Sequence, residues 1–202
     1  MLDRSFYARP ALDVARDLLG LVLVRREAAA TLAGRIVEVE AYVGVNDRAS
    51  HAWRGKTARN AAMFGPPGHA YVYFTYGMHW CLNLVTDAEG VPAAVLLRAI
   101  EPLEGIELMR ARRPKARKDA QLTSGPARLC QAFGIDGSFN GADLCAPDAS
   151  LYVEDRGLGH GPIVAAPRVG VDYAGKWARE PFRFYDAASP FVSVRGTEVS
   201  PQ

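Results

Sequence analysis

Glu40 is the side chain whose type and position most favour chemistry. It lies in the segment 35–44, whose residues divide between two faces: Ile36, Glu38, Glu40 and Tyr42 on one, Val37, Val39, Ala41 and Val43 on the other. Such alternation is typical of a strand, and it places the Glu40 and Tyr42 side chains about 7 Å apart. A carboxylate on an otherwise apolar face is poorly solvated unless it is hydrogen-bonded or acts on a ligand. Glu40 is therefore either catalytic or a structural buried carboxylate, whereas Glu38 fits a rim carboxylate on a half-exposed strand.

An aromatic segment, residues 69–83, predicts a hairpin that turns at Tyr76-Gly77. At the period of a strand its side chains form two sets: Tyr71, Tyr73 and Thr75 on one face, and Val72, Phe74 and Tyr76 on the other. A strand core would bury only one of these faces, so the second aromatic set needs another use. The glycine puts the Tyr76 ring at the hairpin tip. An aromatic wedge beside an aromatic pocket is what an enzyme needs to hold a base outside a duplex.

Three further polar side chains are candidates for a binding site. His51 lies in a loop that returns toward the Glu40 strand, where it could stack on a planar ligand or hydrogen-bond to it; a surface loop histidine is the commoner outcome. Asn83 and Arg98 lie near the ends of apolar strand segments, where burial of a polar group is costly unless the group is hydrogen-bonded or binds a ligand. The structural alternatives are an asparagine that closes a turn and an ion pair between Arg98 and Glu101.

Basic side chains in two segments could contact phosphates. One segment is the loop that carries Arg48, Arg54, Lys56 and Arg59. The other is the basic run 110–118, for which a solvated loop is the better interpretation. Only four of the 24 basic residues are lysines, and arginine suits bidentate phosphate contacts, although a genomic bias toward arginine explains the excess equally well. The net charge of +2 does not by itself indicate a polyanionic partner.

Motifs for several other chemistries are missing from the sequence. The spacing of His69, His79 and Cys81 matches no tetrahedral metal site, so metal binding is not expected. There is no P-loop, no G-x-S-x-G, no G-x-G-x-x-G and no zinc deaminase signature. Lys56, Lys115 and Lys118 lie in polar stretches and Lys176 lies in the segment YAGKW (173–177), and none of the four resembles a Schiff-base nucleophile.

Length and composition predict one globular domain spanning residues 1–202. The apolar fraction of 49% and the charged fraction of 23% are those of an ordinary water-soluble protein with a full core. Three cysteines without a CxxC pair, and no apolar leader, predict buried free thiols in a reducing compartment, by default the cytoplasm of a prokaryote. No run approaches the roughly twenty apolar residues of a membrane-spanning helix.

The order of predicted elements favours an α+β fold with a mostly antiparallel sheet. Helices are predicted over 10–19, over 101–112 and from Ser124 to Gly134, and strands over 21–24, 35–44, the aromatic hairpin and 91–99. Residues 45–68 form a polar loop punctuated by Gly and Pro. The strands do not alternate regularly with the helices, which argues against a parallel βαβ sheet.

Taken together, these segments resemble the alkyladenine (3-methyladenine) DNA glycosylase family. The resemblance covers nearly the whole chain, in the shared order of LLG (18–20), VEVEAYVG (37–44), NAAMF (60–64), GHAYVYFTYGM (68–78), VLLRAIEP (95–102), SGPARLC (124–130), RVGV (168–171) and FRFY (182–185). It implies a single compact α+β domain with a curved sheet, flanking helices and a protruding aromatic β-hairpin. It also implies that no metal or other cofactor is used and that the protein acts on double-stranded DNA as a monomer.

The resemblance also implies a role for each matching side chain. Glu40 would be the general base that activates the water attacking C1′ of a flipped nucleotide. Tyr76 would enter the minor groove and fill the vacated space, and Arg98 would support the pocket and the DNA backbone. Asn83 would disfavour purines with a 2-amino group. The damaged base would stack in a pocket formed by Tyr42, His51 and Tyr73.

The implied activity is that of a monofunctional DNA glycosylase in base excision repair. It would release 3-methyladenine, and also 7-methylguanine, hypoxanthine and ethenoadenine, and leave an uncut abasic site. Two alternatives stay open: a non-catalytic binder of lesions that uses the same pocket, and a hydrolase of free nucleosides. Glu40 argues against the first and the protruding Tyr76 against the second.

Overall fold

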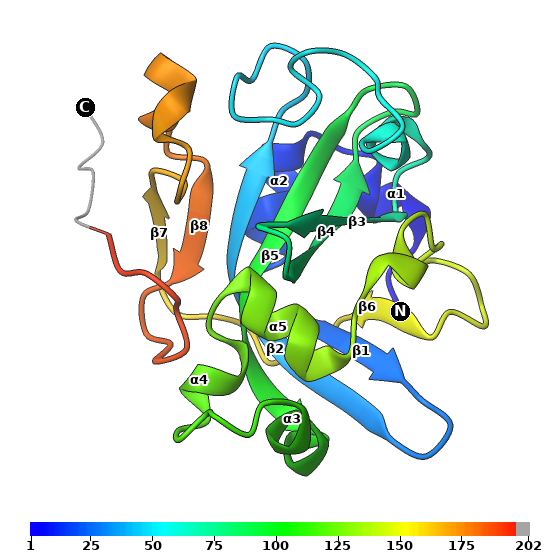
Figure 1. Cartoon of the computed structure of the whole chain (residues 1–202), viewed down its shortest axis with the longest axis vertical. Coiled ribbons are helices and arrows are strands. Elements are labelled where there is room, and N and C mark those ends of the chain that lie inside the picture. The colour runs from blue at the N-terminus through cyan, green and yellow to red at the C-terminus, as the bar shows by residue number, and fades with distance from the viewer. Residues whose placement is uncertain (197–202) are drawn as a thin grey trace.

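Eight strands form one curled sheet in the computed structural model of the chain, which describes residues 1–196 (Figure 1). Neighbouring strands are antiparallel, in the order β3-β4-β5-β2-β1-β6, and β8 pairs with both β2 and β7. The strands are β1 (Val22–Arg26), β2 (Thr31–Tyr42), β3 (Ala70–Thr75), β4 (His79–Thr86), β5 (Ala93–Glu104), β6 (Leu151–Glu154), β7 (Ile163–Ala166) and β8 (Arg183–Asp186). The predicted α+β class with an antiparallel curved sheet is confirmed. The end of the predicted domain, 197–202, lies outside the described residues.

Strand β2 is the central element of the sheet and carries Glu40. It pairs with β5 along most of its length, with β1 over its first part and with β8 over its later part. The register against β5 shifts between Ile36 and Glu38 and again between Glu38 and Val39. A β-bulge inserts an unpaired residue and inverts the alternation of side chains. Ile36 therefore packs in the same core cluster as Val39, and the prediction that it shares a face with Glu38 and Glu40 is wrong.

Helices cover the sheet from two sides. They are α1 (Arg4–Tyr7), α2 (Ala11–Asp17), α3 (Ile106–Arg112), α4 (Ala120–Thr123) and α5 (Pro126–Phe133), with 3-10 helices η1 (Ala61–Phe64), η2 (Gly137–Phe139) and η3 (Asp172–Ala178). Figure 1 shows α1 and α2 behind the sheet and α3, α4 and α5 at its lower end. Helix α5 begins with a proline at its first position and ends at Gly134, which has φ 64°. These are the usual start and stop signals of a helix, and the prediction ended it at the same glycine.

The helix predicted over 101–112 begins later than expected. Residues 101–104 extend β5, where Glu101 pairs in register with Arg35 of β2. Their side chains form an ion pair at 2.6 Å. Sheet pairing and this ion pair outweigh the helical preference of the local sequence. Helix α3 starts only after Gly105. The φ of 72° at this glycine is a left-handed conformation, which turns the chain from the strand into the helix.

The β3–β4 hairpin ends in a tight turn at the predicted position. Tyr76 and Gly77 have φ values of 52° and 67°, and the amide of Met78 donates to the carbonyl of Thr75 at 3.2 Å. Two successive residues with positive φ are characteristic of a type I′ hairpin turn. The turn exposes 85% of Tyr76. The exposed aromatic hairpin tip is therefore a property of the fold.

Candidate active site

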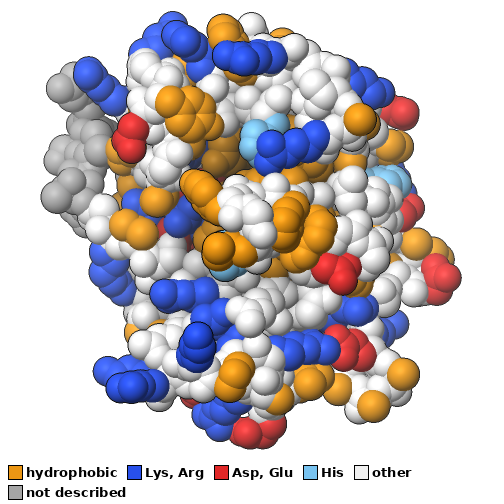
Figure 2. Space-filling model, viewed as in Figure 1, with side chains coloured by type: hydrophobic (Ala, Val, Ile, Leu, Met, Phe, Trp, Pro, Cys, Tyr) orange, Lys and Arg blue, Asp and Glu red, His pale blue; other side chains and the backbone are white. Residues whose placement is uncertain are grey.

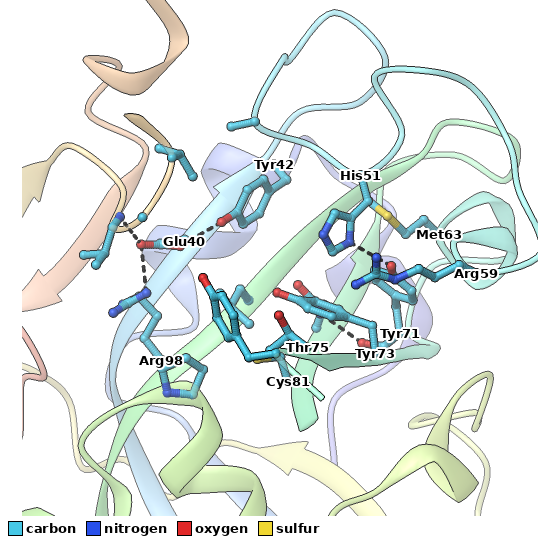
Figure 3. A pocket seen from close by; sticks show the side chains of 18 of the residues that line it. Glu40, Tyr42, His51, Arg59, Met63, Tyr71, Tyr73, Thr75, Cys81 and Arg98 are labelled. Carbon is cyan, nitrogen blue, oxygen red and sulfur yellow. Dashed lines mark hydrogen bonds and ion pairs between the residues drawn. The ribbon is translucent and has the colours of Figure 1, made fainter. Parts of the chain in front are cut away.

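A pocket of about 460 Å³ opens beside the hairpin tip. Strands β2, β3, β4 and β5 form its floor, and the loop 43–69 and the segment 169–173 form its sides. Figure 3 shows Glu40 and Arg98 at one end of the pocket, His51 and Arg59 at the other, and tyrosine rings between them. Eight of the side chains selected from the sequence line this pocket. They are Glu40, Tyr42, His51, Arg59, Tyr73, Tyr76, Asn83 and Arg98.

Glu40 is fully buried and held by three groups. Its Oε2 accepts the hydroxyl of Tyr42 at 2.9 Å, and its Oε1 accepts the amide of Val169 at 2.8 Å. The Nη1 of Arg98 lies 3.1 Å from the same Oε1. The cation, the amide and the hydroxyl together fix the orientation of the Glu40 carboxylate at the pocket wall.

Arg98 is shared between two buried carboxylates. Its Nε lies 3.0 Å from Glu38 Oε1, and its Nη1 contacts Glu40. Burial by itself lowers the pKa of Arg98, but the charges of Glu40 and Glu38 outweigh burial and raise this pKa above its ordinary value. The alternative ion pair between Arg98 and Glu101 is wrong, because Glu101 pairs with Arg35.

Glu38 is buried, and the prediction of a rim carboxylate is wrong. It is 0% exposed and accepts from Arg98, from Arg183 Nη1 at 3.0 Å and from the amide of Ser193 at 2.6 Å. Strand β8 and the segment after it cover this part of β2, which the pattern of the local sequence does not reveal.

Aromatic rings from two strands and a loop line the pocket. The ring centroids of His51 and Tyr73 lie 4.5 Å apart at an interplanar angle of 79°, and His51 Nδ1 lies 2.9 Å from the Tyr71 hydroxyl. Burial and then Arg59 lower the pKa of His51 to about 4, so its ring is neutral at physiological pH. Burial also raises the pKa of Tyr73 and, together with Glu40, that of Tyr42. The rings are therefore uncharged and present flat surfaces that suit a planar ligand.

Asn83 lies in the interior of β4, opposite Tyr71 of β3. It is 4% exposed, and its Nδ2 donates to the carbonyl of Tyr71 at 3.0 Å. The alternative that Asn83 closes a turn is therefore wrong. Its amide is braced across the hairpin while its side chain lines the pocket.

Exposed side chains surround the mouth of the pocket. Tyr76 is 85% exposed and Tyr173 is 68% exposed, and both contribute to the lining. The guanidinium of Arg59 lies 5.6 Å from the Tyr73 ring centroid and donates to the Phe74 carbonyl at 3.2 Å. Arg54 is exposed and stands outside the lining formed by the described residues. In Figure 2, Lys and Arg side chains lie above and below the apolar hairpin on this face.

Two residues that hold the site in place were not identified from the sequence. Arg168 binds both carboxylate oxygens of Asp47, at 2.5 and 2.9 Å, and donates to the Ala41 carbonyl at 2.9 Å. Arg168 precedes Val169, whose amide reaches Glu40. Arg168 and Asp47 are 121 positions apart in the chain. In the sequence, each of them is only a charged residue next to an apolar segment. This pattern does not show that the two side chains pair with each other.

Arginines of the basic run 110–118 form ion pairs with side chains of other segments. Arg110 bridges Glu107 at 2.6 Å and Asp119 at 2.9 Å, and Arg112 reaches Glu27 at 2.8 Å. These arginines attach α3 to its surroundings, so the interpretation as a solvated loop is wrong for them.

Residues 1–196 contain neither a metal-binding cluster nor a membrane-spanning helix. No three His, Cys, Asp or Glu side chains in this range are arranged to hold a metal ion. No helix in the same range has the length and apolar character to cross a membrane.

The geometry of the pocket suits hydrolysis at a planar leaving group. A buried carboxylate beside an arginine can orient a water molecule and stabilise positive charge that develops on a sugar. Neutral aromatic rings opposite it can hold a flat, electron-poor base by stacking. Carboxylate and rings open into the same pocket, so one ligand can contact both.

Comparisons with known proteins place this chain in a family. The model of the methylpurine-DNA glycosylase family matches residues 5–190. A relative from Methanocella arvoryzae is 60% identical over 195 residues, which are 96% of each chain. A relative from Streptomyces avermitilis is 51% identical over 95% of this chain and 90% of its own, and one from Myxococcus xanthus is 50% identical over 95% and 93%. All three relatives are provisionally named 3-methyladenine DNA glycosylase. The chain therefore belongs to the methylpurine-DNA glycosylase family, whose members are hydrolases of N-glycosyl bonds in DNA.

Proposed function

We propose that the protein is a monofunctional glycosylase that removes damaged purines from double-stranded DNA. Its substrates are 3-methyladenine and, with it, 7-methylguanine, hypoxanthine and ethenoadenine. The observation that carries this proposal is the fully buried Glu40 at the wall of an aromatic pocket. The relatives provisionally named as 3-methyladenine DNA glycosylases support the same substrate class.

The damaged nucleotide leaves the helix and enters the pocket. Flipping costs a few kcal/mol, and least where pairing is already weak. Stacking contributes about 1–3 kcal/mol per base, so the rings of Tyr42, His51 and Tyr73 offset this cost. Tyr76, exposed at the hairpin tip, fills the gap left in the duplex. An alkylated purine carries positive charge, which adds attraction to ring faces.

Glu40 activates the water that attacks C1′. Its carboxylate accepts a proton from the water and stabilises the cationic sugar, and such general-base help is worth about 10²–10⁴-fold in rate. Arg98 holds the carboxylate at 3.1 Å and orients it. The glycosidic bond breaks with its electron pair moving to the base. A cationic methylated purine leaves as a neutral base, whereas hypoxanthine or ethenoadenine must also take up a proton as it leaves. The sugar becomes an abasic site in an uncut strand. No cofactor takes part in this scheme.

Selectivity comes from the pocket wall. Asn83, braced by the Tyr71 carbonyl, disfavours a purine with a 2-amino group by steric and hydrogen-bond conflict. Arg54 and Arg59 contact phosphates beside the lesion. We expect a monomer that works on chromosomal DNA in a prokaryotic cytoplasm.

The test is base release from methylated duplex DNA, with wild type and Glu40→Gln compared. Wild type should release 3-methyladenine and leave alkali-labile but uncut strands, whereas Glu40→Gln should bind the lesion and release nothing. Excision retained by Glu40→Gln would remove Glu40 as the base. Lesion binding without release by either protein would favour the non-catalytic binder, and faster hydrolysis of free nucleosides than of duplex would favour the nucleoside hydrolase.

A further inference from the structure

The guanidinium of Arg98 is held on all three nitrogens. Its Nη1 faces Glu40 at 3.1 Å, its Nε faces Glu38 at 3.0 Å, and its Nη2 donates to Ser193 Oγ at 3.2 Å. A planar guanidinium fixed at three points cannot rotate without breaking contacts. Glu38 therefore supplies the anchor on the side of Arg98 that faces away from Glu40.

Glu38 lies behind the pocket rather than in it. It is absent from the lining that residues 1–196 form. Arg183 Nη1 lies 3.0 Å from its Oε1, and the Ser193 amide donates to its Oε2 at 2.6 Å. Arg183 is also attached to the backbone, through the carbonyls of Pro167 at 2.8 Å and Val194 at 2.6 Å. Glu38 thus connects the pocket to β8 and the segment that follows it.

Glu38, Glu40, Arg98 and Arg183 form a buried charge quartet of two acids and two bases. Each is 6% exposed or less. Burying four charges is costly, and a neutral acceptor in place of Glu38 would be enough to hold one nitrogen of Arg98. The second acid and second base therefore have a consequence beyond packing, namely the electrostatic field that they exert on Glu40.

We propose that Glu38 is a positioning residue for the reaction, which fixes Arg98 against Glu40 and, balanced by Arg183, sets the charge environment in which Glu40 works. This inference rests on the proposed function. Glu38 places a negative charge on the same guanidinium that contacts Glu40, and Arg183 places a positive charge beside Glu38. Loss of Glu38 removes a contact that fixes Arg98, and loss of Arg183 removes a contact that holds Glu38.

Other groups face Glu40 from each neighbouring element, and the variants used below leave them unchanged. They are Tyr42 on β2, Tyr73 on β3, Cys81 on β4, Arg98 on β5 and Tyr173 on η3. Burial is the main cause that raises the pKa of Tyr42, Tyr73, Cys81 and Tyr173, so these four stay neutral at acid pH. His51, across the pocket, has a pKa of about 4 and titrates alike in all the variants.

The experiment is the pH dependence of single-turnover release of a cationic alkylated purine from duplex DNA. It compares wild type, Glu38→Gln, Arg183→Gln and the double variant. The pH profile of the release rate should move in opposite directions in Glu38→Gln, which removes a negative charge, and in Arg183→Gln, which removes a positive charge, and it should return toward wild type in the double variant. The same pH profile in all four proteins would overturn the proposal.

Two further variants separate positioning from folding. Glu38→Asp keeps the charge but shortens the side chain, so it should lower the plateau rate about tenfold while lesion affinity and the shape of the pH profile stay as in wild type. Unchanged plateau rate in Glu38→Asp would overturn the positioning role even where Glu38→Gln fails to fold. Glu101→Gln is the matched control, because it removes a carboxylate from an ion pair on the same sheet outside the pocket lining; its profile should match wild type. Failure of wild type to release any base would instead reject the proposed function.

Discussion

The guanidinium of Arg168 lies over the ring of Tyr42, 4.7 Å from its centroid. The same guanidinium is fully buried and binds Asp47 through two nitrogens. Tyr42 is thus held from above by a cation and at its hydroxyl by Glu40. This contact attaches the loop after β2 and the segment before η3 to β2.

Replacement of Asp47 by alanine should destabilise the whole protein. It leaves the charge of Arg168 buried without its carboxylate, and breaking such a pair costs about 3–5 kcal/mol. The measurement is the free energy of unfolding in urea. The matched control is Asp17→Ala, which breaks the exposed pair with Arg9 and should cost about 1 kcal/mol or less. Equal losses in the two variants would contradict the role of Asp47.

Replacement of Tyr42 by phenylalanine should slow excision by about tenfold and leave lesion affinity nearly unchanged. The ring that stacks on the base remains, but the hydrogen bond to Glu40 Oε2 is lost. The measurement is the single-turnover rate beside the Kd for the same duplex. A loss of affinity with an unchanged rate would place the hydroxyl in base binding instead.

Replacement of Tyr76 by alanine should weaken binding to damaged duplex by about tenfold or more, because a stacked ring is lost from the gap. Excision from a strand that is already distorted should change much less. Leu158→Ala is the control, since it removes an exposed apolar side chain outside the pocket lining that residues 1–196 form. If Tyr76→Ala and Leu158→Ala bind as wild type does, the assignment of Tyr76 as a wedge fails.

His51 should stay neutral down to a pH of about 4, its pKa in the folded protein. The ordinary pKa of histidine is about 6.5, so the unfolded chain binds the proton first and folding loses free energy as pH falls from 6.5 toward 4. His51→Gln should flatten this part of the stability profile. NMR titration of the imidazole tests the first statement directly, and a midpoint near 6.5 would contradict it.

The local pattern of the sequence located one end of the site because that end depends on single strands. Alternation placed Glu40 and Tyr42 on one face, and the Tyr76-Gly77 pair predicted the hairpin turn. It failed at Ile36, because a β-bulge inverts the alternation and depends on pairing with β5. Sequence periodicity carries no information about a partner strand's register.

Contacts between distant segments could not be predicted. The amide that binds Glu40 belongs to Val169, 129 positions away, and Glu38 is covered by Ser193, 155 positions away. A backbone donor has no side-chain signature, and Glu38 reads as an ordinary strand carboxylate until β8 is placed beside it. The resemblance to the family identified the pocket residues but not this buried support.

Tyr76 occupies a left-handed backbone conformation, with φ 52°, that glycine or asparagine adopts at lower cost. A bulky residue there stores strain, of order 1 kcal/mol, in the turn. Glycine or asparagine at this position would make the hairpin more stable, but a wedge requires an aromatic ring. Selection of this protein for heat resistance alone should replace Tyr76 early, and the gain in thermal stability would be accompanied by loss of repair.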